Sequence, residues 1–155
     1  RITDHVAQES GLASVYDELT NAGNVRYEVE HIWANRPERH VDEFSHAADF
    51  RRHRNRIGDL LLLPKQFNAS YSDIPYEDKL PHYFGQNLLA ASLNPLSYEK
   101  NPGFVDFIER SQLPFKPYGS FKAADIDERG ELYRQIAKRV WNPDDLLTLV
   151  DSDAA

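Results

Sequence analysis

The 155-residue sequence contains no cysteine and no methionine, and it has no long apolar stretch. Without cysteine the chain has no disulfide, no thiolate-bound zinc and no thiol catalysis. The longest aliphatic run is the four leucines at 60–63, far short of the roughly 18 apolar residues that a membrane span requires. The chain also opens on Arg1 with no apolar leader. We therefore expect no membrane span, and we expect the chain to be a fragment of a longer protein.

A surplus of positive charge is also missing. The formal net charge is −7, from 25 acidic residues against 18 lysines and arginines, which by itself argues against nucleic-acid binding. The distribution is uneven, because residues 26–70 hold eight basic and seven acidic residues. The densest basic cluster, residues 51–56, reads Arg-Arg-His-Arg-Asn-Arg. Such a cluster is typical either of a solvated helix end or of a surface that contacts phosphates through arginine.

Hydrophobic periodicity predicts two short strands separated by a long polar connection. Residues 25–33 alternate, with Val25, Tyr27 and Val29 on one parity, which is typical of a strand. The leucine run at 60–63 predicts a second, buried strand that pairs with the first. The connection over residues 37–55 is predicted to contain one short helix at 44–52. A connection of this length in a small domain is usually functional or disordered.

The rest of the sequence predicts helices and one turn. Helices are expected over 6–19, 65–71, 76–83, 88–93, 104–111, 125–141 and 144–150, and a turn over 21–24. Pro81 is expected to kink or end its helix. These elements predict a mainly helical α+β fold in a single domain, residues 1–155. Its core would span about residues 25–83, with a helical extension at about 84–150.

Four polar residues lie where the predicted strands end and the next helix begins: Glu30, His31, Asp59 and Asn68. Each of these residue types is common in purely structural roles, such as turns and caps. Their joint order on a strand–connection–strand–helix frame is the informative feature. Histidine, with a pKa of about 6.5, is a suitable general base at neutral pH. Carboxylate and amide oxygens are the ligands that Mg²⁺ or Mn²⁺ prefers.

Three segments of the sequence resemble HNH (His-Me finger) nucleases. They are residues 27–32 (YEVEHI), residues 56–63 (RIGDLLLL) and residues 68–75 (NASYSDIP), followed by Lys79. More specifically, they resemble the C-terminal nuclease domain of GmrSD-type modification-dependent restriction enzymes, a group that includes a phosphorothioate-linked defence protein. The resemblance implies a ββα-metal core, in which a two-stranded antiparallel sheet and a helix hold the site, surrounded by additional helices.

The resemblance implies a role for each polar residue of the frame. His31 matches the general base, Glu30 the preceding acid that often binds the metal, and Asn68 the metal ligand on the helix. Asp59 occupies the middle position, which orients the histidine and ties the strands together. That position is usually asparagine, so Asn55 is a candidate for the missing amide. The extra negative charge of Asp59 is predicted to raise the pKa of His31 or to make Asp59 a metal ligand.

The position of Glu30 carries a geometric condition. Adjacent residues of a strand point to opposite faces of a sheet. Glu30 and His31 can therefore share a site only if the first strand ends or bulges between them.

The function implied by the resemblance is a metal-dependent DNA endonuclease that nicks or cleaves DNA. It would use Mg²⁺ or Mn²⁺ and act as the effector of a bacterial, cytoplasmic restriction or anti-phage protein. The expected phosphate contacts are Arg51, Arg52, Arg54, Arg56 and Lys79. Target choice would belong to an N-terminal NTPase or sensor domain of the same polypeptide.

Two alternatives remain open at this point, as does the oligomeric state. The first is a non-catalytic DNA-binding or regulatory module that keeps a degraded HNH frame, which the aspartate at position 59 favours. The second is an interaction domain whose acidic helices bind a partner protein.

Overall fold

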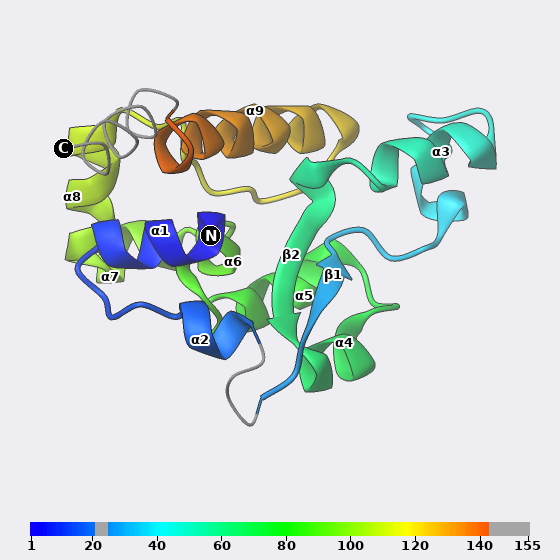
Figure 1. Ribbon diagram of the computed structural model, residues 1–155. Coiled ribbons are helices and arrows are strands. Elements are labelled where there is room, and N and C mark those ends of the chain that lie inside the picture. Colours follow the sequence, from blue (N-terminus) through cyan, green and yellow to red (C-terminus); the bar gives the residue numbers. More distant parts are fainter. Residues whose placement is uncertain (21–24, 143–155) are drawn as a thin grey trace, which may run out of the picture.

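The computed structural model describes residues 1–20 and 25–142 (Figure 1). The turn predicted at 21–24 and the helix predicted at 144–150 lie outside these residues. The elements before the second strand are α1 (Ile2–Glu9), α2 (Tyr16–Leu19), β1 (Tyr27–His31), the 3₁₀ helix η1 (Pro37–His40), α3 (Ala47–Arg54) and the 3₁₀ helix η2 (Ile57–Asp59). The remaining elements are β2 (Leu60–Pro64), α4 (Lys65–Tyr71), α5 (Tyr76–Tyr83), α6 (Leu88–Ala91), α7 (Leu96–Lys100), α8 (Pro102–Ser111) and α9 (Ala123–Val140).

The two strands form an antiparallel ribbon with a regular register, from Tyr27 opposite Pro64 to His31 opposite Leu60. Residues directly opposite each other point to the same face, so Glu30 shares its face with the buried Leu61. The other face carries His31 and is more open. The predicted mainly helical α+β fold with a two-stranded sheet is therefore confirmed.

Two hydrophobic cores flank the sheet, and α9 contributes to both of them. The first core lies under the sheet, where Ile32, Leu63 and Phe50 are fully buried, and it takes Ile126 from α9. The second lies among α1, α6, α8 and α9, and it takes Leu132, Tyr133 and Ile136 from the same helix. Figure 1 shows α9 running past the start of β2 toward α8. This long helix therefore joins the core under the sheet to the helical extension.

Three helix predictions differ from the structure. The single helix predicted at 6–19 is two helices, because the chain leaves α1 through Gly11 at a φ of +79°, which favours glycine. Pro81 lies inside α5 without ending it. Burial of Tyr76, Lys79 and Tyr83 along this helix offsets the backbone hydrogen bond that proline removes. The short helix α7 was not predicted, since five residues hold too little periodicity.

No helix in the described part of the chain is long and apolar enough to cross a bilayer.

Candidate active site

His31 is the last residue of β1, and its half-buried imidazole contacts the residue that ends α3. Its Nε2 atom lies 3.0 Å from Oδ1 of Asn55, which is the C-cap of α3. A ring proton on Nε2 would donate to this amide oxygen and leave Nδ1 with a free lone pair. The structure therefore brings His31 together with the amide that the sequence suggested, although 24 residues separate them.

The surroundings of His31 lower its pKa below the ordinary value of 6.5. Burial is the largest cause, and the positive charges of Arg54 and Lys79 act in the same direction, while the hydrogen bond to Asn55 opposes them. The predicted upward shift caused by Asp59 is therefore wrong. Asp59 is enclosed in the protein, whereas cations act on the imidazole. The lowered pKa favours the uncharged imidazole, which is the form that accepts a proton.

Asp59 is completely buried at the start of β2, behind His31. Its Oδ1 accepts a hydrogen bond from the Trp33 backbone N–H (3.1 Å), and its backbone carbonyl accepts one from Ile32 (2.8 Å). Asp59 thus ties the two strands together, as the resemblance implied. Burial raises the pKa of its carboxyl well above the usual range, although the hydrogen bond from Trp33 opposes this. Its Oδ2 is buried and has no hydrogen-bond partner in the described part of the chain, so the role of Asp59 as a metal ligand stays a prediction.

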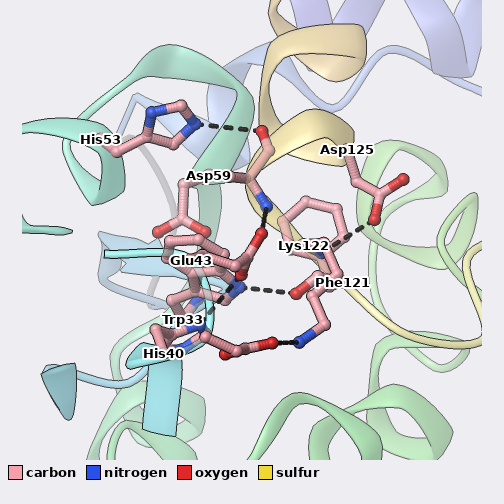
Figure 2. Close-up of polar contacts among 10 residues, drawn as sticks. Trp33, His40, Glu43, His53, Asp59, Phe121, Lys122 and Asp125 are labelled. Carbon is pink, nitrogen blue, oxygen red and sulfur yellow. Dashed lines mark hydrogen bonds and ion pairs between the residues drawn. The ribbon is translucent and has the colours of Figure 1, made fainter. Parts of the chain in front are cut away.

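The segments that carry Trp33, Glu43 and Gly58 contact the start of α9 or the residues just before it. Figure 2 shows the contacts of Trp33 and Glu43. The indole N–H of Trp33 donates to the Phe121 carbonyl (2.8 Å), and the Ala123 N–H donates to Oε1 of Glu43 (2.8 Å). Gly58 packs against α9 so closely that a Cβ there would lie 1.9 Å from the Ile126 carbonyl oxygen. The glycine before Asp59 is therefore required by the approach of a helix backbone.

Glu30 and Lys79 form a buried ion pair under the sheet. The Lys79 Nζ donates to Oε1 of Glu30 (2.6 Å) and to the backbone carbonyl of His31 (2.9 Å). The exposed fraction of Glu30 is 3% and that of Lys79 is 0%. Since β1 is regular through His31, the Glu30 carboxylate points away from the imidazole. Two expectations are therefore corrected, that Glu30 binds metal and that Lys79 contacts a phosphate. The Glu30 carboxylate pairs with the Lys79 ammonium group, and Lys79 has no exposed surface that a phosphate could reach.

Asn68 on α4 lies at the free edge of β1, close to His31 along the strand. Its Nδ2 donates to the Val29 carbonyl (3.3 Å), two residues before His31. Its Oδ1 is buried and has no partner in the part of the chain that the structure describes. An unpaired amide oxygen of this kind fits a hard divalent cation. Within residues 1–20 and 25–142, no group of three His, Asp or Glu side chains could hold a metal, so water and phosphate would have to complete the coordination.

The four arginines of the basic cluster have different surroundings, which the sequence did not reveal. Arg52 pairs with Asp49, and Arg56 pairs with Asp127. Arg51 is exposed. Arg54 is half-buried and turns inward, where its Nε donates to the Trp33 carbonyl (2.8 Å). Its partner is a backbone atom 21 residues away, and no sequence pattern identifies such a contact.

Comparison with known proteins identifies the family of the chain. Residues 3–136 match a family model described as the C-terminal domain of GmrSD restriction endonucleases. The match includes the sheet, α3, α4 and most of α9. No curated protein and no solved structure matches the chain. The chain therefore belongs to the family of GmrSD restriction endonucleases and corresponds to their C-terminal domain.

Proposed function

We propose that this domain is an HNH-type, metal-dependent DNA endonuclease in which His31 is the general base. The observation that carries the proposal is the 3.0 Å contact between Nε2 of the half-buried His31 imidazole and Oδ1 of Asn55. A ring proton on Nε2 would leave Nδ1 free to accept a proton, and the lowered pKa of His31 favours the uncharged ring. The unpaired Oδ1 of Asn68, on the helix that follows β2, supports a metal position nearby. Lowered basicity of the imidazole also suits a base that must be free at neutral pH.

In the proposed reaction, His31 Nδ1 takes a proton from water as the water oxygen bonds to phosphorus. The P–O bond to one ester oxygen breaks, and that oxygen leaves as a hydroxyl group after taking a proton from solvent. Asn68 would hold Mg²⁺ or Mn²⁺ through Oδ1. When bound, such an ion supplies positive charge for the phosphate and the leaving oxygen. Asn55 keeps the imidazole oriented and fixes its tautomer.

The biological setting is also part of the proposal. The domain would be the effector of a bacterial, cytoplasmic restriction or anti-phage protein, and an N-terminal NTPase or sensor domain of the same polypeptide would select the DNA. Weak intrinsic affinity for DNA agrees with the net charge of −7. The alternative, a non-catalytic DNA-binding or regulatory module with a degraded HNH frame, is favoured by Asp59 at the middle position and by the absence of any group of three His, Asp or Glu side chains that could hold a metal in the described residues.

Nicking of supercoiled plasmid tests the proposal. We expect conversion to the nicked or linear form with Mg²⁺ or Mn²⁺, and none with EDTA. Replacing Asn68 with alanine should raise the metal concentration needed for half-maximal rate by roughly tenfold or more, because coordination is weakened. Asn68→Asp, which keeps an oxygen in place and adds a negative charge, should retain or lower that requirement.

The matched control for Asn68 is Gln66→Ala, an exposed position of the same helix, which should behave as the parent. Cleavage that persists in EDTA would contradict the metal dependence. If neither this chain nor a longer polypeptide that contains it cleaves DNA with any divalent metal, the degraded-frame alternative is correct.

The pH dependence of cleavage is a second expected result. His31 must be unprotonated to act, so the rate should rise with pH and level off above the pKa of His31. Because burial and nearby cations lower that pKa, the midpoint of the acidic limb should lie below 6.5. The measurement is the cleavage rate at subsaturating DNA across the acidic range, which reports the pKa of His31 in the protein free of DNA. A midpoint above 6.5 would contradict the assignment.

A further inference from the structure

We propose that Arg54 is a catalytic residue, whose terminal amino groups hold the phosphate that is being cleaved. The inference rests on the proposed function and deepens it, since it selects one arginine of four for the reacting group. The other three would contact flanking phosphates or make only ion pairs within the protein.

The first observation is that Arg54 is fixed in place before any DNA arrives. Its Nε donates to the Trp33 carbonyl (2.8 Å), and Trp33 is itself held by Asp59 and by the Phe121 carbonyl. Its stem is half-buried between α3 and the end of β1. A donor that is already ordered loses little conformational freedom when it binds charge in a transition state.

The second observation is the position of Arg54 beside the proposed base. It immediately precedes Asn55, the residue that contacts His31. Its Nε contacts the carbonyl of Trp33, two residues after His31. The end of α3, which carries Arg54 and Asn55, therefore meets the end of β1, which carries His31.

The third observation is that the terminal nitrogens of Arg54 are unused. Neither Nη1 nor Nη2 makes a hydrogen bond or an ion pair with any residue in 1–20 or 25–142, and neither is sealed from solvent. Arg52 and Arg56, in the same cluster, are each held by an aspartate. A guanidinium with two free amino groups matches the paired oxygens of a phosphate.

No acid pairs with this arginine in the described residues. Burial lowers the pKa of Arg54, and the nearby Asp59 and Glu30 oppose that shift without forming a direct ion pair with it. The two amino groups are therefore left for an anion from outside. The negative charge on the phosphate oxygens increases during attack by water, so this contact strengthens in the transition state.

The test is single-turnover DNA cleavage at saturating Mg²⁺, with DNA affinity measured separately by fluorescence anisotropy in Ca²⁺. We expect Arg54→Gln to slow the saturated rate by about 10²- to 10³-fold and to change DNA affinity by less than about threefold. Arg54→Lys keeps the charge without the two-pronged geometry, so a loss of roughly tenfold is expected. Guanidinium ion added to Arg54→Ala should restore part of the rate.

Two comparison variants make the result specific to Arg54. Arg51→Gln, on the exposed face of the same helix, should weaken DNA binding and lower the slope of log affinity against log salt by about one. Arg110→Gln, which pairs with Glu9 at the surface of α8, should behave as the parent. Thermal unfolding of each Arg54 variant checks whether the contact of Arg54 with Trp33 is needed for folding.

The outcomes separate this inference from the proposed function. If the parent cleaves and Arg54→Gln cleaves within threefold of it, the inference is wrong and the nuclease assignment stands. If Arg54→Gln fails to fold, Arg54→Lys decides: a folded variant that cleaves at the parent rate overturns the inference. A slow Arg54→Ala that guanidinium does not rescue would reduce Arg54 to a structural role. A parent that cleaves with no metal would remove both proposals.

Discussion

Replacement of His31 by alanine is expected to slow metal-dependent DNA cleavage by about 10²- to 10⁴-fold. This loss corresponds to about 2.7–5.4 kcal/mol of transition-state stabilisation. The physical reason is that water then lacks a neutral acceptor for its proton at the site where Asn55 orients the ring. The DNA affinity should change little, because the lowered pKa of His31 favours the uncharged imidazole. Single-turnover cleavage and anisotropy measure the two quantities separately.

The control for His31 is His46→Ala, since His46 is an exposed histidine just before α3. This variant should cleave as fast as the parent. Added imidazole should partly restore cleavage by His31→Ala, because the lost group is a diffusible base. A His31→Ala protein that is folded, binds DNA and cleaves at the parent rate would exclude His31 as the base.

Replacement of Lys79 by methionine is expected to lower the free energy of unfolding by about 3–5 kcal/mol. Lys79 is fully buried and its ammonium group contacts Glu30 at 2.6 Å. Without it, a carboxylate that is 3% exposed has no counter-charge. Urea unfolding followed by tryptophan fluorescence gives the difference. A loss of this size is a large fraction of the stability of a small domain.

Two variants test the cause of that loss. In the double variant Glu30→Leu with Lys79→Met, both charges are gone, so most of the stability should return. Lys65→Met removes a surface ion pair, since Lys65 lies 3.6 Å from Glu28 with both side chains well exposed. Its cost should stay below about 1 kcal/mol. If Lys79→Met costs no more than Lys65→Met, the buried pair does not stabilise the fold.

The sequence located the frame of the site well because its elements are encoded locally. Alternation around Val29 and the leucine run predicted both strands, and the helix at 65–71 was predicted with the bounds of α4. The order of His31, Asp59 and Asn68 on this frame supported the family assignment, which the match over residues 3–136 shows. The region between the strands was harder, because its contacts are with α9 and lie far away in the sequence.

Local sequence patterns could not predict which group each charged residue contacts, because the charge of a side chain does not identify its partner. In the sequence Glu30 resembles a metal ligand, and Lys79 and Arg54 resemble phosphate contacts. The regular register of β1 turned Glu30 into the core, where Lys79 meets it. Burial then made that pair structural.

The sequence by itself determined the two strands, most of the helices, the family and the order of the candidate site residues along the chain. These depend on periodicity, on turn residues and on motif order, which are properties of neighbouring residues. Only the tertiary structure decided the direction of the pKa shift of His31, the burial of Asp59 and the inward turn of Arg54. Each depends on groups brought together by packing against α5 and α9, because burial and charge act through space and not along the chain.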